Sequence, residues 1–99
     1  MSRARRSVKS KVDYLEIWLY VAERNKDAAD DLLRSFDKAI DLLADFPGLG
    51  THRDDLKRGV LTYPVGNYLV LYRRVDGGIE VIRVAHGARD LRRLFRPSK

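Results

Sequence analysis

The sequence contains no cysteine. This absence excludes a disulfide scaffold, a thiolate metal site and a cysteine nucleophile, and it is consistent with a reducing compartment such as the cytoplasm. The longest apolar runs span only a few residues, so no segment is predicted to cross a membrane. The chain starts with the basic segment MSRARRSVKSK, but no apolar stretch follows it, and we do not expect a secretory signal.

Histidine is also scarce, and His52 and His86 are the only two. Neither has a second ligand at the spacing of a metal site, so no metal is expected. No serine lies in a nucleophile elbow. The glycine-containing segments GLG and DGG lack the helix and the lysine of a phosphate-binding loop. The sequence therefore predicts no cofactor.

The 99 residues suffice for one domain, residues 1–99, and 44% of them are hydrophobic, which is typical of a globular chain. The formal net charge is +6, with basic residues concentrated at both ends and aspartates in the middle. Basic ends favour an acidic partner, either nucleic acid or an acidic protein surface. The alternative interpretation is a surface charge that only keeps a small domain soluble.

Helical patterns fill the first half of the chain. Ser7 is typical of a helix N-cap, and two apolar stripes follow it on opposite sides of the predicted helix. The first stripe contains Val8, Val12, Leu15, Leu19 and Ala22, and the second contains Tyr14, Ile17, Trp18 and Val21. One side is expected to face the core and the other a partner protein. A second helix begins at Asn25 or Asp27 and ends before Pro47 and Gly48.

Strand patterns begin at residue 60. The segments VLTYPV, YLVLYRRV and IEVIRVA predict three strands, which turns at Gly66–Asn67 and Asp76–Gly77 connect into an antiparallel meander. A short basic helix is expected at about residues 90–96, and residues 1–6 are either an edge strand or a loose arm. We therefore predict an α+β fold, in which an N-terminal helical hairpin packs on one face of a small antiparallel sheet. The other face is expected to be free.

The residues leave one enzymatic class open, a metal-independent endoribonuclease. That reaction needs a base, an acid and cations near the phosphate. The candidate residues are His86, Arg89, Tyr72 and Arg58. Structural interpretations compete with these roles: Tyr72 as a sheet residue, and His86 as a hydrogen-bond partner of the loop that it begins. Arg89 and Asp90 would pin that loop, with Asp90 as the cap of the last helix.

The pattern as a whole resembles the ParE branch of the RelE/ParE superfamily, the toxins of type II toxin–antitoxin systems. Four motifs carry the resemblance, which covers about residues 7–95: Glu16–Trp18; Leu43, Pro47 and Gly50; Gly66, Tyr68 and Tyr72; and the segment VAHGARD, Val84–Asp90. The resemblance implies a cytoplasmic toxin that a ParD-like antitoxin neutralises. The complex is expected to reach operator DNA only through the antitoxin.

The two branches of the superfamily differ in their targets. ParE-type members inhibit DNA gyrase and stabilise cleaved DNA, whereas RelE-type members cut mRNA in the ribosome. RelE-type members usually carry an arginine directly after the strand tyrosine and lysines on the preceding strand. Here those positions are Leu69 and Val60–Tyr63. This departure favours gyrase inhibition and argues against an enzyme, with the RelE-type ribonuclease as the alternative.

The resemblance also assigns candidate binding residues. The C-terminal part of the chain is expected to engage gyrase or its bound DNA, through His86, Arg89, Arg92, Arg93 and Arg96. An amphipathic antitoxin helix is expected on the first helix, at Tyr14, Ile17, Trp18 and Val21. A third interpretation is a non-toxic family member that only binds its antitoxin.

Overall fold

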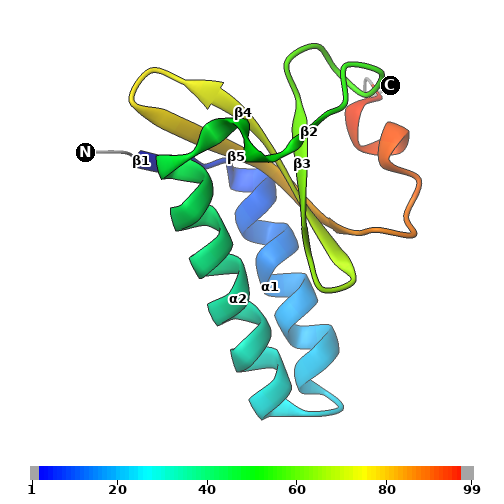
Figure 1. The fold of residues 1–99 in the computed structure, drawn as a ribbon. Helices are drawn as coiled ribbons and strands as arrows, with labels where there is room; N and C mark the ends of the chain where they lie inside the picture. Colours follow the sequence, from blue (N-terminus) through cyan, green and yellow to red (C-terminus); the bar gives the residue numbers. More distant parts are fainter. Residues whose placement is uncertain (1–2, 97–99) are drawn as a thin grey trace.

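A five-stranded mixed sheet organises the protein in a computed structural model that describes residues 3–96 (Figure 1). Its strand order is β1-β5-β4-β3-β2. The strands are β1 (Arg3–Arg6), β2 (Thr51–His52), β3 (Leu61–Val65), β4 (Tyr68–Val75) and β5 (Gly78–His86). β3, β4 and β5 form the predicted antiparallel meander. Gly66 and Gly77 close its two turns at positive φ, a conformation that favours glycine.

Residues 3–6 form an edge strand, so the edge-strand interpretation holds for them. β1 runs parallel to β5, from the pair Arg3–Gly78 to the pair Arg6–Val81. The sheet is therefore mixed, and the prediction of a purely antiparallel sheet was wrong. Gly78 permits this pairing because a Cβ atom there would lie 1.8 Å from the Arg3 carbonyl oxygen. No local sequence pattern predicts a contact between residues that lie so far apart along the chain.

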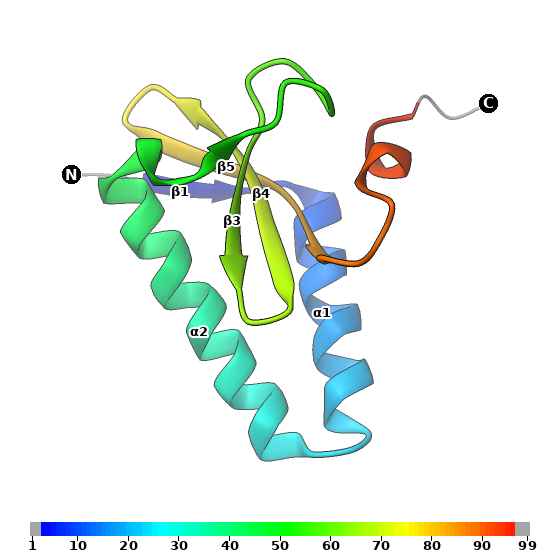
Figure 2. The ribbon, with the colours of Figure 1, turned by 45° about the vertical axis from the view of Figure 1, so that its right-hand side comes forward.

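Two helices cover one face of the sheet (Figures 1 and 2). α1 (Val8–Ala22) begins after Ser7, whose side chain accepts the Ser10 N–H at 3.0 Å. α2 (Lys26–Asp45) begins after Asn25, whose side chain accepts the Ala28 N–H at 3.0 Å. The helices form the predicted hairpin. α2 ends where the 3₁₀ helix η1 (Pro47–Leu49) begins, because proline cannot continue the backbone hydrogen bonds.

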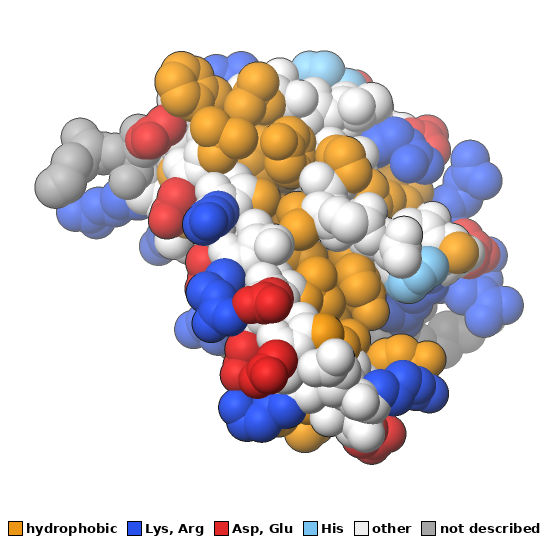
Figure 3. Space-filling view, turned by 60° about the horizontal axis from the view of Figure 1, so that its bottom comes forward, with side chains coloured by type: hydrophobic (Ala, Val, Ile, Leu, Met, Phe, Trp, Pro, Cys, Tyr) orange, Lys and Arg blue, Asp and Glu red, His pale blue; other side chains and the backbone are white. Residues whose placement is uncertain are grey.

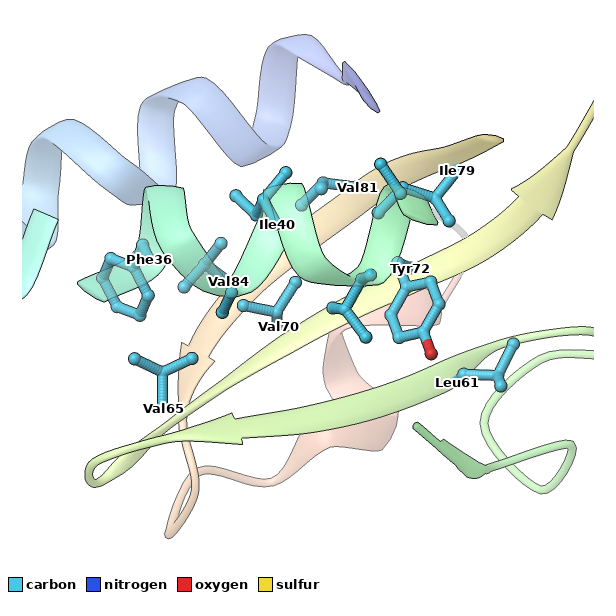
Figure 4. Packing of buried hydrophobic residues seen from close by; sticks show 12 residues of the cluster. Phe36, Ile40, Leu61, Val65, Val70, Tyr72, Ile79, Val81 and Val84 are labelled. Atoms are coloured by element: carbon cyan, nitrogen blue, oxygen red, sulfur yellow. The ribbon is translucent and has the colours of Figure 1, made fainter. Parts of the chain in front are cut away.

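The main core lies between α2 and the sheet (Figure 4). Phe36 and Ile40 of α2 pack over Val70, Tyr72 and Val84 of the two longest strands. Phe36, Val70 and Tyr72 are fully buried. Spacing of apolar residues along α2 and alternation along the strands bring these side chains to one interface.

A second, smaller core covers the other face of the sheet, which the sequence predicted to be free. It contains the buried residues Val60, Leu71, Ala85 and Leu91. The cover comes from the loop before β3 and from η2 (Leu91–Phe95), which Leu56, Leu94 and Phe95 anchor. η2 is a five-residue 3₁₀ helix instead of the predicted helix over 90–96. So short a segment makes too few hydrogen bonds to stabilise an α-helix.

Candidate functional site

A pocket of about 310 Å³ lies between α1 and the end of β5. Its lining combines two carboxylates with aromatic and basic side chains: Asp13, Glu16, Ile17, Tyr20, Tyr68, Val84, Ala85, His86 and Arg89. The structure thus brings His86 and Arg89, both predicted site residues, to one pocket with α1. An open pocket with both charge signs is suited to binding polar groups of a partner.

His86 is the exposed last residue of β5. Its Nδ1 accepts the Ala88 N–H at 3.1 Å, as the structural interpretation predicted for a histidine that bonds its own loop. The ring also contacts Tyr68 edge-on, with 5.3 Å between centroids. Because Nδ1 accepts a hydrogen bond, the neutral ring carries its proton on Nε2 and can act there as a donor.

Asp13 is a buried carboxylate in the floor of the pocket, and the sequence analysis missed it. It accepts hydrogen bonds from Arg83 Nε at 2.7 Å, from Arg83 Nη2 at 2.9 Å and from the Val84 N–H at 3.0 Å. The hydrogen bond to Asp13 raises the pKa of Arg83. Asp13 is one of two carboxylates in the largely apolar α1, and its place between Val12 and Tyr14 was the available signal. Asp13 holds the end of β5, and therefore His86, in position against α1.

The four nuclease candidates do not gather at one place. Tyr72 is fully buried, and its hydroxyl donates to the Pro47 carbonyl at 2.7 Å and accepts the Gly50 N–H at 2.9 Å. Burial raises the pKa of Tyr72, which disfavours the phenolate. Arg58 lies in the loop on the opposite face of the sheet, beside Arg73. Of the four, the structure joins only His86 and Arg89.

The basic C-terminal segment is divided between surfaces. Arg92 lies 3.6 Å from Asp55, and Arg93 lies 3.7 Å from Asp90. Asp90 also accepts the Arg92 N–H at 3.2 Å, which confirms its predicted role as an N-cap. Arg96 lines a depression with Lys9 on the second face of the sheet. The five predicted target-binding residues therefore follow one another along the segment from His86 to Arg96 without forming one cluster.

The predicted antitoxin contacts on α1 are half-buried. The Tyr14 hydroxyl binds the Leu33 carbonyl at 3.1 Å and the Asp37 carboxylate, and Trp18 Nε1 donates to Asp30 at 2.9 Å. Burial raises the pKa of Tyr14 to about 12. Tyr14 and Trp18 thus form hydrogen bonds with groups on α2, so this side of α1 faces α2.

The exposed side of α1 carries the first apolar stripe except Ala22, which is half-buried. Val8 is 77% exposed, Leu15 is 58% exposed and Leu19 is 50% exposed, and the other large exposed residues of this helix are Val12 and Tyr20. We name Val8, Val12, Leu15, Leu19 and Tyr20 the α1 stripe. Tyr14, Ile17, Trp18 and Val21 are half-buried on the other side, and their role as antitoxin contacts stays a prediction. Their spacing on the helix could not distinguish the two sides.

A second exposed apolar group lies where α2 ends. It comprises Leu42, Phe46 and Leu49. Figure 3 shows hydrophobic side chains in a nearly continuous band across one face of the molecule, with charged side chains on both sides. Apolar surface of this kind on a small fold marks a protein that binds a partner protein.

The fold and these surfaces define a small partner-binding protein, and comparison with known proteins gives its family. Residues 5–91 match the family model described as the ParE toxin of the type II toxin–antitoxin system parDE. The chain belongs to this family. This confirms the resemblance that the motifs indicated.

Individual relatives agree with this assignment. The chain is 32% identical over 93 residues to Toxin ParE1 of Caulobacter vibrioides, covering 93% of this chain and 96% of that protein. It is 34% identical over 80 residues to Toxin ParE1 of Mycobacterium tuberculosis, covering 79% of this chain and 82% of that protein. A solved chain of the chromosomal ParDE system of P. aeruginosa shares the fold, with a TM-score of 0.71, 18% identity and coverage of 87% of this chain and 96% of that one.

Within residues 3–96, no three histidine or carboxylate side chains lie close enough together to hold a metal ion. No helix in that range has the length and hydrophobicity that a membrane span requires.

Proposed function

We propose that this protein is the toxin of a type II pair, that a ParD-like antitoxin neutralises it, and that it inhibits DNA gyrase and stabilises cleaved DNA. Membership of the ParE family supports the first two statements. On this proposal the protein acts in the cytoplasm, as one domain over residues 1–99, by binding and not as an enzyme. The operator sequence is recognised only indirectly, through the antitoxin.

One observation carries the choice of gyrase over RNA cleavage. The hydroxyl of Tyr72 makes its hydrogen bonds inside the fold, with the Pro47 carbonyl and the Gly50 N–H. Arg58 lies on the opposite face of the sheet from His86 and Arg89. Cleavage of RNA requires a base and cations placed around one phosphate. The dispersal of these side chains supports a toxin that binds its target.

The antitoxin-binding surface in this proposal is centred on the α1 stripe. Val8, Val12, Leu15 and Leu19 recur at intervals of three and four along one side of the helix, and Tyr20 borders them, so an amphipathic antitoxin helix fits along this side. The previously predicted contacts Tyr14, Ile17, Trp18 and Val21 border this surface and support α1 from the α2 side. We propose that they contact the antitoxin at the border of the α1 stripe.

The target-binding surface in this proposal is the edge formed by the pocket and the C-terminal segment. His86 and Arg89 are exposed beside the α1 stripe, and Arg92, Arg93 and Arg96 follow. Because Glu16 and Tyr20 line the same pocket, an antitoxin on α1 also covers part of this edge. Neutralisation then follows from occupation of the target-binding surface.

A gyrase assay with the purified toxin tests this proposal. We expect linear, cleaved DNA to accumulate when toxin is added to gyrase and supercoiled plasmid, and to disappear when antitoxin is added first. Normal gyrase activity at all toxin concentrations would contradict the proposal. A ribosome-bound mRNA cleavage assay would then test the ribonuclease alternative, and absence of growth arrest on expression would indicate the non-toxic alternative.

A further inference from the structure

Cations collect on the face of the sheet opposite the helical hairpin. Two neighbouring depressions of about 320 and 210 Å³ share Lys57 and Ile82 as lining residues. Arg5 of β1 joins them because its register partner is Glu80, which lines the first depression and also pairs with Arg73. We name this region the basic surface, and its cations are Arg5, Lys9, Lys57, Arg58, Arg73 and Arg96.

A rigid loop presents Lys57 and Arg58. The Arg53 N–H donates to the Val60 carbonyl at 2.8 Å, and the Gly59 N–H donates to the Asp54 carboxylate at 2.9 Å. Leu56 is packed into the second core. The two cations are therefore exposed on a fixed backbone, so less entropy is lost when they bind an anion.

Most of these cations form no ion pair with a carboxylate in the described part of the chain. Within residues 3–96, Arg5, Lys9, Lys57, Arg58 and Arg96 are absent from the ion pairs of the structure. Glu80 is the one carboxylate that lines the two depressions in this part of the chain, and Arg73 already binds it at 2.7 Å. Arg83 borders the surface, but Asp13 satisfies its charge.

Apart from Glu80 and the loop residue Asp54, most acidic residues lie on other parts of the molecule. α2 carries six aspartates, and the loop carboxylate Asp55 binds Arg53 and approaches Arg92. Segregation of like charges on one face increases their mutual repulsion, which solubility alone does not require. A bound polyanion would relieve this repulsion. The asymmetry therefore points to a ligand with many negative charges.

The chemistry of the surface selects among polyanions. Phe95 is the aromatic residue that lines the two depressions within residues 3–96, and it packs into the second core. Single-stranded nucleic acid is usually held by exposed aromatic side chains that stack on bases, and such a platform is missing from this surface. Cations alone are suited to the phosphates of a duplex.

We propose that the basic surface binds the phosphate backbone of duplex DNA without sequence preference. Arg5 and Arg73 flank β5 in the sheet, so strand spacing separates their backbones by about 10 Å. Lys57 and Arg58 lie beside them in the loop. The proposal rests on the proposed function in one respect: it gives the toxin a direct contact with the DNA that gyrase holds.

Fluorescence anisotropy of the free toxin with a labelled 20-base-pair duplex tests this proposal. With four to five phosphate contacts, the logarithm of the association constant should fall against the logarithm of salt concentration with a slope of about −4. Lys57→Gln combined with Arg58→Gln should reduce the slope to about −2 and weaken binding at least tenfold in 100 mM salt. Both side chains are exposed, so the fold should persist.

The matched control is Arg34→Gln combined with Lys38→Gln, which removes the same charge from α2. Equal weakening by the two double variants would overturn the proposal, because net charge alone would then explain binding. Tighter binding of single-stranded RNA, or full competition by polyglutamate, would overturn it in favour of another partner. DNA binding by the toxin alone needs no gyrase, so its failure is distinguishable from failure of the gyrase assay.

Discussion

Asp13 connects the middle of α1 to the end of β5, 70 residues later in the chain. Its carboxylate is 7% exposed and the Arg83 side chain is 16% exposed, so water screens this ion pair weakly. The carboxylate also satisfies the backbone N–H of Val84. One side chain thus determines how the helix lies against the strand that ends in His86.

Replacement Asp13→Ala is predicted to lower the free energy of unfolding by about 3 kcal/mol. The change leaves a buried guanidinium and a buried N–H without their acceptor. Urea denaturation followed by circular dichroism measures the loss. Asp37→Ala is the control, because its pair with Arg6 is more exposed and is worth less. A loss below 1 kcal/mol for Asp13→Ala would contradict this account.

At the residue scale the sequence predicted two contacts and missed two. The Asp90 cap and the hydrogen bond of His86 to its own loop depend on neighbours in sequence, so local patterns were sufficient. The Asp13–Arg83 pair and the Tyr72 hydrogen bonds to Pro47 and Gly50 join distant segments. No spacing rule predicts such partners.

α1 is the element whose two apolar sides have different roles. Trp18 is held on the inner side by its hydrogen bond to Asp30, and this bond lowers the pKa of that carboxylate. Leu15 and Leu19 are at least half exposed. The inner side therefore contributes to the fold, and the outer side leaves apolar surface exposed, where the antitoxin is proposed to bind.

Replacement of both Leu15 and Leu19 by alanine is predicted to weaken antitoxin binding about 30-fold, or about 2 kcal/mol, because both are large apolar residues at the centre of the proposed groove. The free energy of unfolding should change by less than about 0.5 kcal/mol, since both side chains are exposed. Calorimetric titration with antitoxin and urea denaturation give the two values.

Trp18→Ala is the matched comparison on the inner side. It removes a half-buried ring and its hydrogen bond, so its main effect should be on stability, with a smaller effect on antitoxin affinity. The opposite result, in which Trp18→Ala abolishes binding while the leucine variant binds normally, would restore Trp18 as the central contact.

Element boundaries followed from local chemistry where caps and turns were present. The serine and asparagine caps, Pro47 and the glycine turns placed both helices and the meander correctly. β1 and the second core were different, because both depend on pairing across the whole chain. The apolar periodicity of α1 was clear, but periodicity on two sides gives no information on which side is buried.

At the scale of the molecule, four arginines follow His86 along the C-terminal segment, and one of them, Arg89, lines the same pocket as His86. Replacement of Arg89, Arg92, Arg93 and Arg96 by glutamine is predicted to reduce DNA cleavage by gyrase at least tenfold at fixed toxin concentration. The loss of electrostatic attraction weakens target binding. The gyrase assay described above measures it, and unchanged cleavage would exclude this edge from the target interface.

The same variant separates target binding from antitoxin binding. Since the α1 stripe is apolar, affinity for the antitoxin should fall less than activity on gyrase. The Arg34→Gln and Lys38→Gln double variant again serves as the control for net charge, because both residues lie on α2, away from the edge.

The parallel pairing of β1 with β5 has a consequence for the synthesis of the protein. The first strand of the chain has no neighbour until residues 78–81 are made, and the Val81 and Val84 side chains that complete the core come at the same late stage. A nascent chain that ends at residue 77 therefore has α1 without its supporting strand. The pocket between α1 and β5 is therefore complete only after residue 86 has been made, and no partner can recognise it on a shorter chain.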